Sequence, residues 1–328
     1  MTKRNVLVAG GAGYIGSHAV LELIRNRDNA VIYDDLSNSC LPEIDNIECI
    51  NGDIGDYNKV IEVLQENKID VVMHFATSSY VEESISDPKK YYVNNISKGI
   101  SFLNAIVDSG VRKLIYSSSC AIYGIPSAIP IKENEKKSPI NPYGQTKAMY
   151  EQILSDYDKA YGLRSICLRY FNAAGADAAG KIGERHEPET HVLPLLMQTA
   201  MGHREEFSVF GTDYDTRDGT CIRDYVHVTD LAIAHLKAIE YLFQNDKSEQ
   251  FNLGSGNGAT VMELIGAIEK TAGIKLNVKK KGRRPGDADI LIADSTKAQT
   301  MLNWVPTHSS IDNIVRTAWA WHTGAGRQ

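Results

Sequence analysis

The hydrophobic positions in the first half of the chain follow two alternating patterns. Apolar runs of strand length cover residues 5–10, 30–34, 47–52, 70–76, 113–119 and 164–171. Segments with apolar residues at helical spacing lie between them, at 14–26, 57–67, about 88–108 and from Tyr143 onward. Short apolar strands that alternate with helices are typical of a parallel sheet with helices on both faces.

The pattern changes after Asn172. Residues 173–191, "AAGADAAGKIGERHEPETH", are rich in glycine and polar side chains, and we expect a loop there. Residues 207–230 indicate short strands and turns, and helices are expected over 229–243 and 260–272. The sequence therefore predicts an α/β fold, namely a Rossmann-type doubly wound parallel sheet with a smaller, partly interleaved C-terminal lobe.

At 328 residues, the chain is long enough for one large domain or two moderate ones. The change of pattern places a first domain at residues 1–172, joined by about 223–250, and a second lobe at 173–328. Hydrophobic residues make up 43% and charged residues 23%, which is an ordinary globular composition. Apolar runs stay well below the ~20 residues that cross a bilayer, so we expect no membrane segment.

The formal net charge of −6, without a clustered stripe of Lys and Arg, argues against a nucleic-acid partner. The one basic cluster, "KKKGRR" at 279–284, is either a solvated loop or an anion site. The five cysteines lack Cys-x-x-Cys spacing and are Cys40, Cys49, Cys120, Cys167 and Cys221. Such a set is typical of a reducing cytoplasm and favours neither a disulfide framework nor a zinc site, so we predict no metal.

The first candidate for chemistry is the glycine motif "GGAGYIG", which contains Gly10, Gly13 and Gly16. It follows a predicted strand and opens a predicted helix, where glycines allow a tight turn and let backbone N–H groups approach a pyrophosphate. The next strand ends in Asp34, near the position of the carboxylate that binds the free 2′-hydroxyl of NAD and repels the 2′-phosphate of NADP. The alternative is a glycine turn that only packing requires.

The second candidate lies in "SPINPYGQTK", where Asn141 and Pro142 are typical of a helix start. In that helix Tyr143 and Lys147 would lie one turn apart on the same face. A phenol has a pKa near ~10, and a neighbouring ammonium or a bound nicotinamide cation would lower that pKa toward the range of an acid/base catalyst. A plain surface pair is the alternative.

The remaining candidates are polar residues at predicted strand ends and in the second half. Ser119 ends the predicted strand at 113–119, and ligands of open α/β sheets bind beyond the carboxyl ends of their strands, so Ser119 could reach a substrate hydroxyl. The alternative is that Ser119 is only the start of a serine-rich loop. Arg223 and Arg284 carry the forked guanidinium that suits a diphosphate, although Arg223 could instead pair with Asp224 or Asp230. Phe210 is either a base-stacking surface or a core residue. The other polar candidates are Asn172, His191 and Asp287.

Together these stretches resemble the extended short-chain dehydrogenase/reductase family, and within it most closely the UDP-glucose 4-epimerases, also called UDP-galactose 4-epimerases. The matching segments are "VLVAGGAGYIGSH", "HFA", "YYVNN", "SSSCAIYG", "NPYGQTK", "LRYFNAAGA", "VFGTDYDTRDGTCIRDYVHVTDL", "FNLGSGNG" and "GRRPGD". They are spread over nearly the whole chain. The resemblance implies a homodimer in which residues 1–172 bind NAD and residues 173–328 bind a UDP-sugar.

The resemblance also implies roles by position. Ser119, Tyr143 and Lys147 match the catalytic serine, tyrosine and lysine. The expected NAD site consists of these three and Gly10, Gly13, Tyr14, Ile15, Gly16, Asp34, Asp35, Leu36, Asn38, Asp53, Ile54, Phe75, Ala76, Asn94 and Phe171. The expected UDP-sugar site consists of Ser119, Tyr143, Asn172, His191, Phe210, Arg223, Arg284, Asp287 and Leu291.

The implied reaction inverts carbon 4 of the sugar, so that UDP-glucose and UDP-galactose interconvert through a transient 4-keto sugar. Tyr143 would take the proton of the C4 hydroxyl while hydride passes to NAD⁺, and Ser119 would bond the same oxygen. Lys147 would hold the pKa of Tyr143 down. The keto sugar would then rotate and take the hydride back on its other face.

Three positions depart from the common family pattern. Ser79 stands where the family often has a lysine, and His191 where some members have Asn. Leu291 stands where some members have a bulky Tyr that closes the sugar pocket. The smaller leucine leaves a UDP-N-acetylglucosamine 4-epimerase, or dual specificity, as an alternative.

Other activities of this fold differ at identifiable positions. A 4,6-dehydratase carries Asp-Glu after its catalytic Ser or Thr, whereas Cys120 and Ala121 follow Ser119 here. A non-catalytic nucleotide-sugar sensor would be expected to lose the Tyr or the Lys, and this chain keeps both. An ordinary dehydrogenase would release NADH, which an assay distinguishes from epimerisation.

Overall fold

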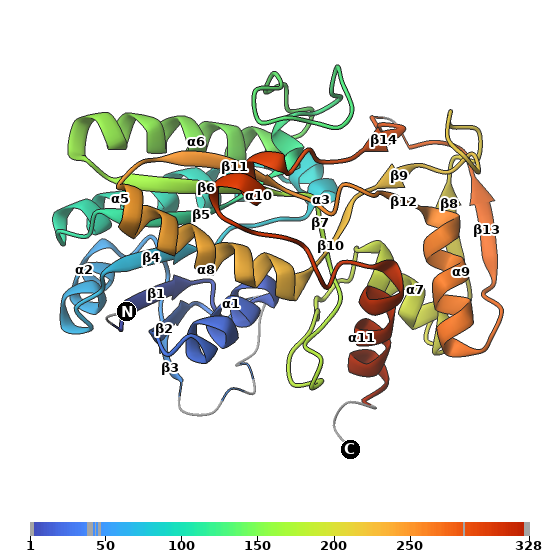
Figure 1. The fold of residues 1–328 in the computed structure, drawn as a ribbon, viewed down its shortest axis with the longest axis horizontal. Helices are drawn as coiled ribbons and strands as arrows, with labels where there is room; N and C mark the ends of the chain where they lie inside the picture. Colours follow the sequence, from blue (N-terminus) through green and yellow to red (C-terminus); the bar gives the residue numbers. More distant parts are fainter. Residues whose placement is uncertain (1–2, 38–41, 43, 45–46, 285, 325–328) are drawn as a thin grey trace.

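A seven-stranded parallel sheet with helices packed on it is the larger of the two parts of the molecule (Figure 1). In spatial order its strands are β11 (Glu249–Leu253), β6 (Arg164–Tyr170), β5 (Lys113–Ser119), β4 (Val71–His74), β1 (Asn5–Ala9), β2 (Asn29–Asp34) and β3 (Glu48–Asn51). The computed structural model describes residues 3–37, 42, 44, 47–284 and 286–324. Within them, every neighbouring pair of these strands is parallel, which confirms the predicted Rossmann-type sheet.

The side chains of β1 show why both faces of the sheet are covered. Val6 and Val8 belong to one buried core, and Leu7 and Ala9 belong to a second core on the opposite face. The helices are α1 (Tyr14–Arg25) and α8 (Val228–Asn245) on the first face, and α2 (Tyr57–Glu66), α5 (Gly99–Asp108) and α6 (Pro142–Tyr161) on the second. Because successive strand residues point to opposite faces, a continuous apolar run is expected for a strand that is buried on both sides.

Helix α6 begins where the sequence predicts. Asn141 caps it, and its side-chain oxygen accepts a hydrogen bond from the backbone N–H of Gly144 at 2.8 Å, while Pro142 opens the first turn. Gly162, with a φ of 69°, ends the helix. Tyr143 therefore lies in the first turn of the helix, at the end nearest the ligand-binding edge of the sheet.

The helix predicted over about 88–108 contains a wider, π-helical segment at Tyr92–Lys98. Asn94 in this segment lines the main cavity of the molecule. Asn95 is buried and holds the chain after β4, because its side chain accepts a hydrogen bond from Ser78 N at 2.8 Å and donates one to Ser78 O at 3.0 Å. π-Helical turns often occur at functional sites, and this one faces the cavity.

The smaller lobe, on the right in Figure 1, has its own buried core. The elements not yet given are α3 (Val81–Ser86), α4 (Pro88–Tyr91), a 3₁₀ turn (Cys120–Ile122), β7 (Asn172–Ala174), α7 (Val192–Ala200), β8 (Phe207–Phe210), β9 (Ile222–Arg223), β10 (Tyr225–His227), β12 (Ala259–Thr260), α9 (Val261–Ala272), β13 (Val278–Lys281), β14 (Ile290–Leu291), α10 (Thr296–Met301) and α11 (Ile311–Thr323). In the smaller lobe, α7, α9 and α11 pack against one another, and β8 pairs in parallel with β13. The helices predicted over 229–243 and 260–272 are confirmed as α8 and α9.

The second half of the chain also contributes to the large sheet. Strand β11 is an edge strand of the sheet, and α8 packs against α1 on one of its faces. Partial interleaving of the two parts is therefore confirmed. The boundary at residue 172 and the addition of about 223–250 to the first domain remain predictions.

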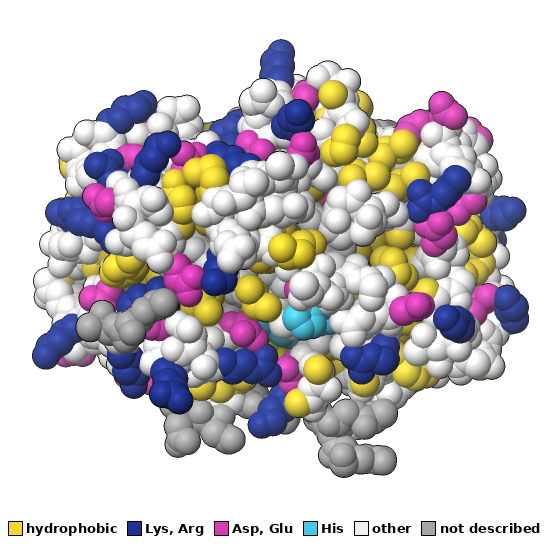
Figure 2. Space-filling model, viewed as in Figure 1, with side chains coloured by type: hydrophobic (Ala, Val, Ile, Leu, Met, Phe, Trp, Pro, Cys, Tyr) yellow, Lys and Arg dark blue, Asp and Glu magenta, His cyan; other side chains and the backbone are white. Residues whose placement is uncertain are grey.

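The outer surface carries both signs of charge. On the face in Figure 2, basic and acidic side chains are interspersed. Within the part of the chain that the structure describes, no helix combines the length and the apolar character needed to cross a lipid bilayer.

Candidate active site

A cavity of about 1410 Å³ lies between the sheet and the smaller lobe. Residues that follow β1, β2, β4, β5 and β6 line one side of it, so it lies beyond the carboxyl ends of the parallel strands. The strand order reverses between β1 and β4, where ligands of doubly wound sheets bind. The volume exceeds that of a typical small-molecule pocket and leaves room for a dinucleotide together with a second ligand.

The predicted site residues converge on this cavity, with two exceptions. Leu36 is not among the lining residues that the structure describes. Its backbone, with a φ of 55°, turns after β2, and its side chain packs against the core on the α1 face. Its assignment as a cofactor contact therefore stays a prediction. Asn38, the other exception, lies outside the described residues.

Gly10, Gly13 and Gly16 differ in whether the surrounding protein leaves room for a side chain. A Cβ on Gly10 would lie 2.5 Å from Ala76 N, and one on Gly16 would lie 2.2 Å from Gly10 O, so packing excludes a side chain at both positions. A Cβ on Gly13 would approach only Gly10 O, at an ordinary 3.4 Å. Gly13 is the N-cap of α1 and makes no side-chain cap bond, which leaves this helix N-terminus accessible to an anion.

The carboxylate at the end of β2 is buried and organises the same loop. Asp34 Oδ2 accepts a hydrogen bond from Ala12 N at 3.0 Å, and Oδ1 accepts one from Leu36 N at 2.9 Å. A carboxylate in this place suits the hydroxyls of a ribose and opposes a phosphate group. The open N-terminus at Gly13 and the acid at Asp34 together fit NAD better than NADP.

Lys147 is almost fully buried behind the ring of Tyr143. Its Nζ lies 5.6 Å from the centre of that ring, and it donates hydrogen bonds to Thr77 Oγ1 at 2.9 Å and to Ser117 O at 2.5 Å. Ser119 also lines the cavity, at the end of β5. The structure therefore brings the predicted tyrosine, lysine and serine to one wall.

Burial has the largest effect on the pKa values of Tyr143 and Lys147. Burial raises the pKa of Tyr143 to about 12, although a hydrogen bond with the Ser119 side chain lowers it in part. Burial also lowers the pKa of Lys147 to about 7. The role of Lys147 in lowering the Tyr143 pKa stays a prediction for the site with its cofactor bound. A bound nicotinamide cation would add a positive charge that favours the phenolate.

The two predicted arginines reach the cavity from the smaller lobe and are already paired. Arg223 Nη1 donates to Ala288 O at 2.8 Å, and Arg223 Nη2 lies 3.4 Å from Asp287 Oδ1; the pairings with Asp224 or Asp230 are not seen among the described residues. Arg284 Nη1 donates to Glu82 Oε1 at 2.8 Å.

Phe210 contributes a partly exposed aromatic face to the cavity. The Arg284 guanidinium lies 4.5 Å above the centre of its ring, at cation–π distance. Phe210 is therefore part of the cavity wall, and Arg284 shows that the cluster at 279–284 supplies one cation to the site. The other predicted positions, Asn172 and Leu291 among them, also line the cavity.

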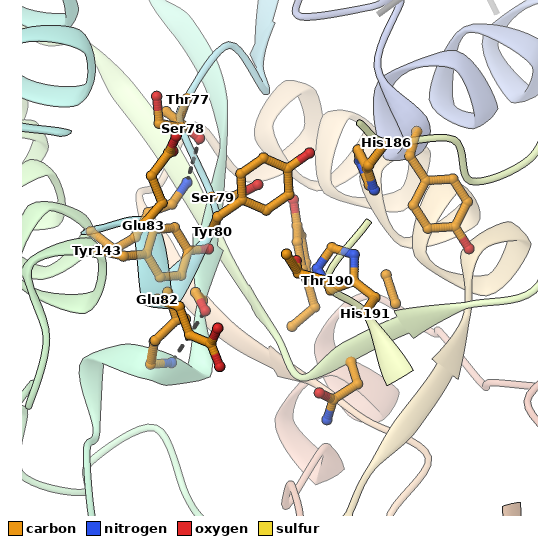
Figure 3. Close-up of a pocket in the computed structure, with 18 of the residues that line it drawn as sticks. Thr77, Ser78, Ser79, Tyr80, Glu82, Glu83, Tyr143, His186, Thr190 and His191 are labelled. Carbon is orange, nitrogen blue, oxygen red and sulfur yellow. Dashed lines mark hydrogen bonds between the residues drawn. The ribbon is translucent and has the colours of Figure 1, made fainter. Parts of the chain in front are cut away.

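The sequence interpretation missed part of the opposite wall. In Figure 3 Tyr80 lies between Tyr143 on one side and His186 and His191 on the other. The ring centres of Tyr80 and His186 are 5.6 Å apart. Apart from His191, the segment before α7 was expected only to form a loop, and the alternation of Glu and His in "GERHEPETH" is the signal that points to this wall.

His186 and His191 share two buried carboxylates, Glu184 and Glu189. Burial would lower the pKa of each histidine, but the carboxylates raise it to about 9 for His186 and about 10 for His191. His191 Nδ1 lies 2.7 Å from Glu184 Oε1. The predicted substrate contact His191 thus belongs to a charged cluster at the cavity edge.

Residues 7–318 match a family model described as GDP-mannose 4,6 dehydratase. A UDP-glucose 4-epimerase of Rhizobium meliloti is 48% identical over 323 residues, which are 98% of this chain and 98% of the relative. The chain belongs to the UDP-glucose 4-epimerase family. A UDP-glucose 4-epimerase of Lactobacillus helveticus is 47% identical over 97% of this chain and 96% of the relative.

Solved structures of the UDP-glucose 4-epimerase family share the whole fold. The enzyme of Brucella ovis, in complex with NAD, has a TM-score of 0.95 at 45% identity, with 98% of each chain covered. The enzyme of Bifidobacterium longum, in complex with NAD⁺ and UDP, has a TM-score of 0.91 at 36% identity, again with 98% of each chain covered.

The site also distinguishes this family from dehydratases. Cys120 and Ala121 line the cavity directly after Ser119, where dehydratases carry an acid pair. Burial raises the pKa of the Cys120 thiol to about 12, so this thiol is a poor proton donor or acceptor at neutral pH. Among the residues that the structure describes, the two that line the cavity directly after Ser119 are thus not carboxylic acids.

Proposed function

We propose that the protein interconverts UDP-glucose and UDP-galactose by inverting carbon 4 of the sugar, with tightly bound NAD as cofactor. One observation carries the proposal. A single cavity contains an accessible helix N-terminus at Gly13, a tyrosine–lysine pair at Tyr143 and Lys147, and two arginines, Arg223 and Arg284. These are the parts that an NAD-dependent reaction on a nucleotide sugar needs.

Tyr143 acts as the acid and base of the reaction in this proposal. Its phenolic oxygen takes the proton of the C4 hydroxyl, and Ser119 bonds the same substrate oxygen. Lys147, held by Thr77 and Ser117, keeps a partial positive charge behind the ring. Gly13, Asp34 and Lys147 would hold NAD⁺, which would supply a hydride acceptor and donor for C4 and a further positive charge in the site.

The substrate has to be anchored at its diphosphate while its sugar stays free to rotate. Arg223 and Arg284 are suited to the diphosphate, and Phe210 to the face of the uracil. Leu291 leaves more room around the sugar than a tyrosine would. The pocket volume is therefore compatible with rotation of the keto sugar and also leaves N-acetylated sugars as an alternative substrate class.

The remaining assignments belong to the same proposal. The site roles of the predicted residues, the NAD-binding domain at 1–172 and the UDP-sugar lobe at 173–328 follow from the family. A homodimer is supported by Tyr92 and Ile100, which are exposed apolar side chains on the helical segment of the sheet domain. The dispersed cysteines support a cytoplasmic location.

The experiment is an assay of the purified protein with UDP-galactose and no added NAD. We expect UDP-glucose to form without release of NADH, because the cofactor is oxidised and reduced within one turnover. Tyr143→Phe should lower the rate by about 10²–10⁴-fold, the usual contribution of general acid–base catalysis. Tyr157→Phe is the matched control, since Tyr157 lies on the same helix but bonds Asn104 outside the cavity. A rate for Tyr143→Phe within a few-fold of wild type would show that the phenol is not the acid/base.

A further inference from the structure

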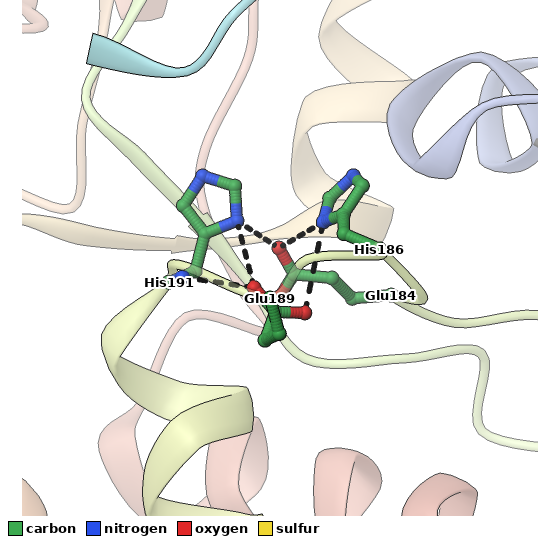
Figure 4. Close-up of side chains that lie close together, drawn as sticks. All are labelled: Glu184, His186, Glu189 and His191. Atoms are coloured by element: carbon green, nitrogen blue, oxygen red, sulfur yellow. Dashed lines mark hydrogen bonds and ion pairs between the residues drawn. The ribbon is translucent and has the colours of Figure 1, made fainter. Parts of the chain in front are cut away.

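Four side chains of one short segment turn their ligand atoms toward a common point (Figure 4). Glu184, His186, Glu189 and His191 lie within eight residues of the chain, just before α7. Each offers one nitrogen or oxygen atom, and these atoms all lie within 4.8 Å of one another. Both histidines use Nδ1, and in Figure 4 their Nε2 atoms point away from the centre.

The spacing of these atoms is close to that of ligands on one metal ion. His186 Nδ1 lies 3.4 Å from Glu184 Oε1 and 3.7 Å from Glu189 Oε2, and His191 Nδ1 lies 3.5 Å from Glu189 Oε1. Ligands at about 2.0–2.2 Å from a tetrahedral Zn²⁺ are separated from each other by roughly 3.4 Å. The pair of His191 Nδ1 and Glu184 Oε1, at 2.7 Å, would have to open, and pairs toward the 4.8 Å limit would have to close.

Burial gives a second, independent observation. The side chains of Glu184 and Glu189 are each only 5% exposed, so two negative charges lie largely away from water. The Nδ1 atom of His186 is also buried, and its contacts with the two carboxylates measure 3.4 and 3.7 Å. These separations are wider than those of a well-formed hydrogen bond.

We propose that Glu184, His186, Glu189 and His191 bind one divalent transition-metal ion, with Zn²⁺ as the expected ion. Two imidazoles and two carboxylates are a nitrogen and oxygen set that Zn²⁺ accepts, whereas Mg²⁺ and Ca²⁺ prefer oxygen alone. When the ion binds, the two histidines lose their protons, and the ion takes over their pairing with the two carboxylates. The site does not depend on the proposed epimerase activity.

The position of the ion assigns it a structural role. All four ligands come from the loop that leads into α7, so the ion would close this loop on itself and fix the cavity wall around His191. The Nε2 atom of His191 would remain outside the coordination shell. Tyr14 and Tyr80 pack edge-on against the ring of His186, at 6.4 and 5.6 Å between ring centres, and they connect the loop to the sheet domain.

The test is metal binding by the full-length protein. Protein treated with a chelator is titrated with ZnCl₂ by calorimetry, and metal content after gel filtration is measured by mass spectrometry. We expect one Zn²⁺ per chain, a higher Tm with Zn²⁺ than with chelator, and no comparable effect of Mg²⁺. Bound Co²⁺ should show the strong visible absorption of a tetrahedral site.

Three variants separate this site from adventitious binding. His186→Gln and Glu189→Gln should each weaken Zn²⁺ binding by at least the 10–100-fold that loss of an outer-shell partner costs. His203→Gln, which changes an exposed histidine outside the cluster, should bind Zn²⁺ as the wild type does. Circular dichroism in chelator shows whether each variant is folded. Absence of stoichiometric binding by the wild type, or equal binding by the folded cluster variants, would overturn the proposal and leave an ion-pair cluster alone.

Discussion

The glycine loop allows a test that separates cofactor binding from folding. Gly13 and Gly16 lie three residues apart, yet a methyl group would meet different surroundings at the two positions. At Gly16 it would lie 2.2 Å from Gly10 O, within the protein. At Gly13 it would meet only Gly10 O at 3.4 Å and otherwise point into the space where the pyrophosphate is expected. Gly13→Ala should therefore impair NAD binding, and Gly16→Ala should impair the fold.

The expected sizes follow from the backbone and the contacts. Gly13 has a φ of −73°, which alanine adopts without strain. Loss of a glycine N-cap costs up to about 1 kcal/mol, and alanine recovers roughly 0.4–1 kcal/mol by restricting the unfolded chain. The stability change of Gly13→Ala should thus stay within about 1 kcal/mol. A methyl group forced against a bound pyrophosphate costs about 1–3 kcal/mol, which is roughly 5- to 150-fold in Kd.

Two measurements on NAD-stripped protein check this. Denaturant unfolding without NAD should show a loss of about 2–3 kcal/mol or more for Gly16→Ala and little change for Gly13→Ala. Calorimetric titration with NAD should show the weaker binding of Gly13→Ala. If Gly13→Ala binds NAD within twofold of wild type, the pyrophosphate does not lie against this residue. If it unfolds as easily as Gly16→Ala, packing accounts for all three glycines.

Three further substitutions test the cavity. Lys147→Met should stabilise the cofactor-free protein most at or below pH 7, and this gain should shrink toward pH 10. A lysine whose folded pKa is about 7 is charged below pH 7 in both the folded and the unfolded state, whereas above pH 7 it is neutral in the folded state and still charged in the unfolded state. A gain in denaturant unfolding that stays constant between pH 7 and 10 would contradict the lowered pKa. Glu82→Gln should lower the Kd of UDP by up to about fivefold, because it releases Arg284 from an exposed ion pair. Weaker UDP binding in calorimetry would contradict this and would mean that Glu82 itself contributes to UDP binding. Leu291→Tyr should lower kcat/KM for UDP-N-acetylglucosamine at least about tenfold and should lower kcat/KM for UDP-glucose less, because one added group in a pocket is worth about 1–3 kcal/mol. Equal effects on both substrates would show that residue 291 does not determine this specificity.

The sequence predicts the sheet and the first wall of the site well, because the signals there are local. The apolar run at β1, the Asn141–Pro142 helix start and the Tyr143–Lys147 spacing all act within a few residues of the chain. The pairing of β11 with β6 and the helix α11 were not predicted, since both depend on partners far along the sequence.

The electrostatic state of the site could not be predicted from spacing. The sequence places an ammonium one turn from a phenol, but the pKa of Tyr143 depends on how much water surrounds both groups in the fold. The pairing of Glu82 with Arg284 joins residues 202 positions apart. His186 and His191 contact the same two carboxylates because of the path that the loop backbone takes before α7. This loop has no regular hydrogen-bond pattern, so its path cannot be predicted from the sequence.

The interleaved connection between the two parts constrains how the protein is made. The core under α1 is completed by Leu231, Leu242 and Phe251, which are translated long after β1. In a nascent chain that ends at residue 172, α1 alone covers the Val6 and Val8 face of the sheet, and part of that face is exposed to water. The sheet has to wait for its last strand, so we expect the two parts to form in one cooperative event late in synthesis, and not one after the other.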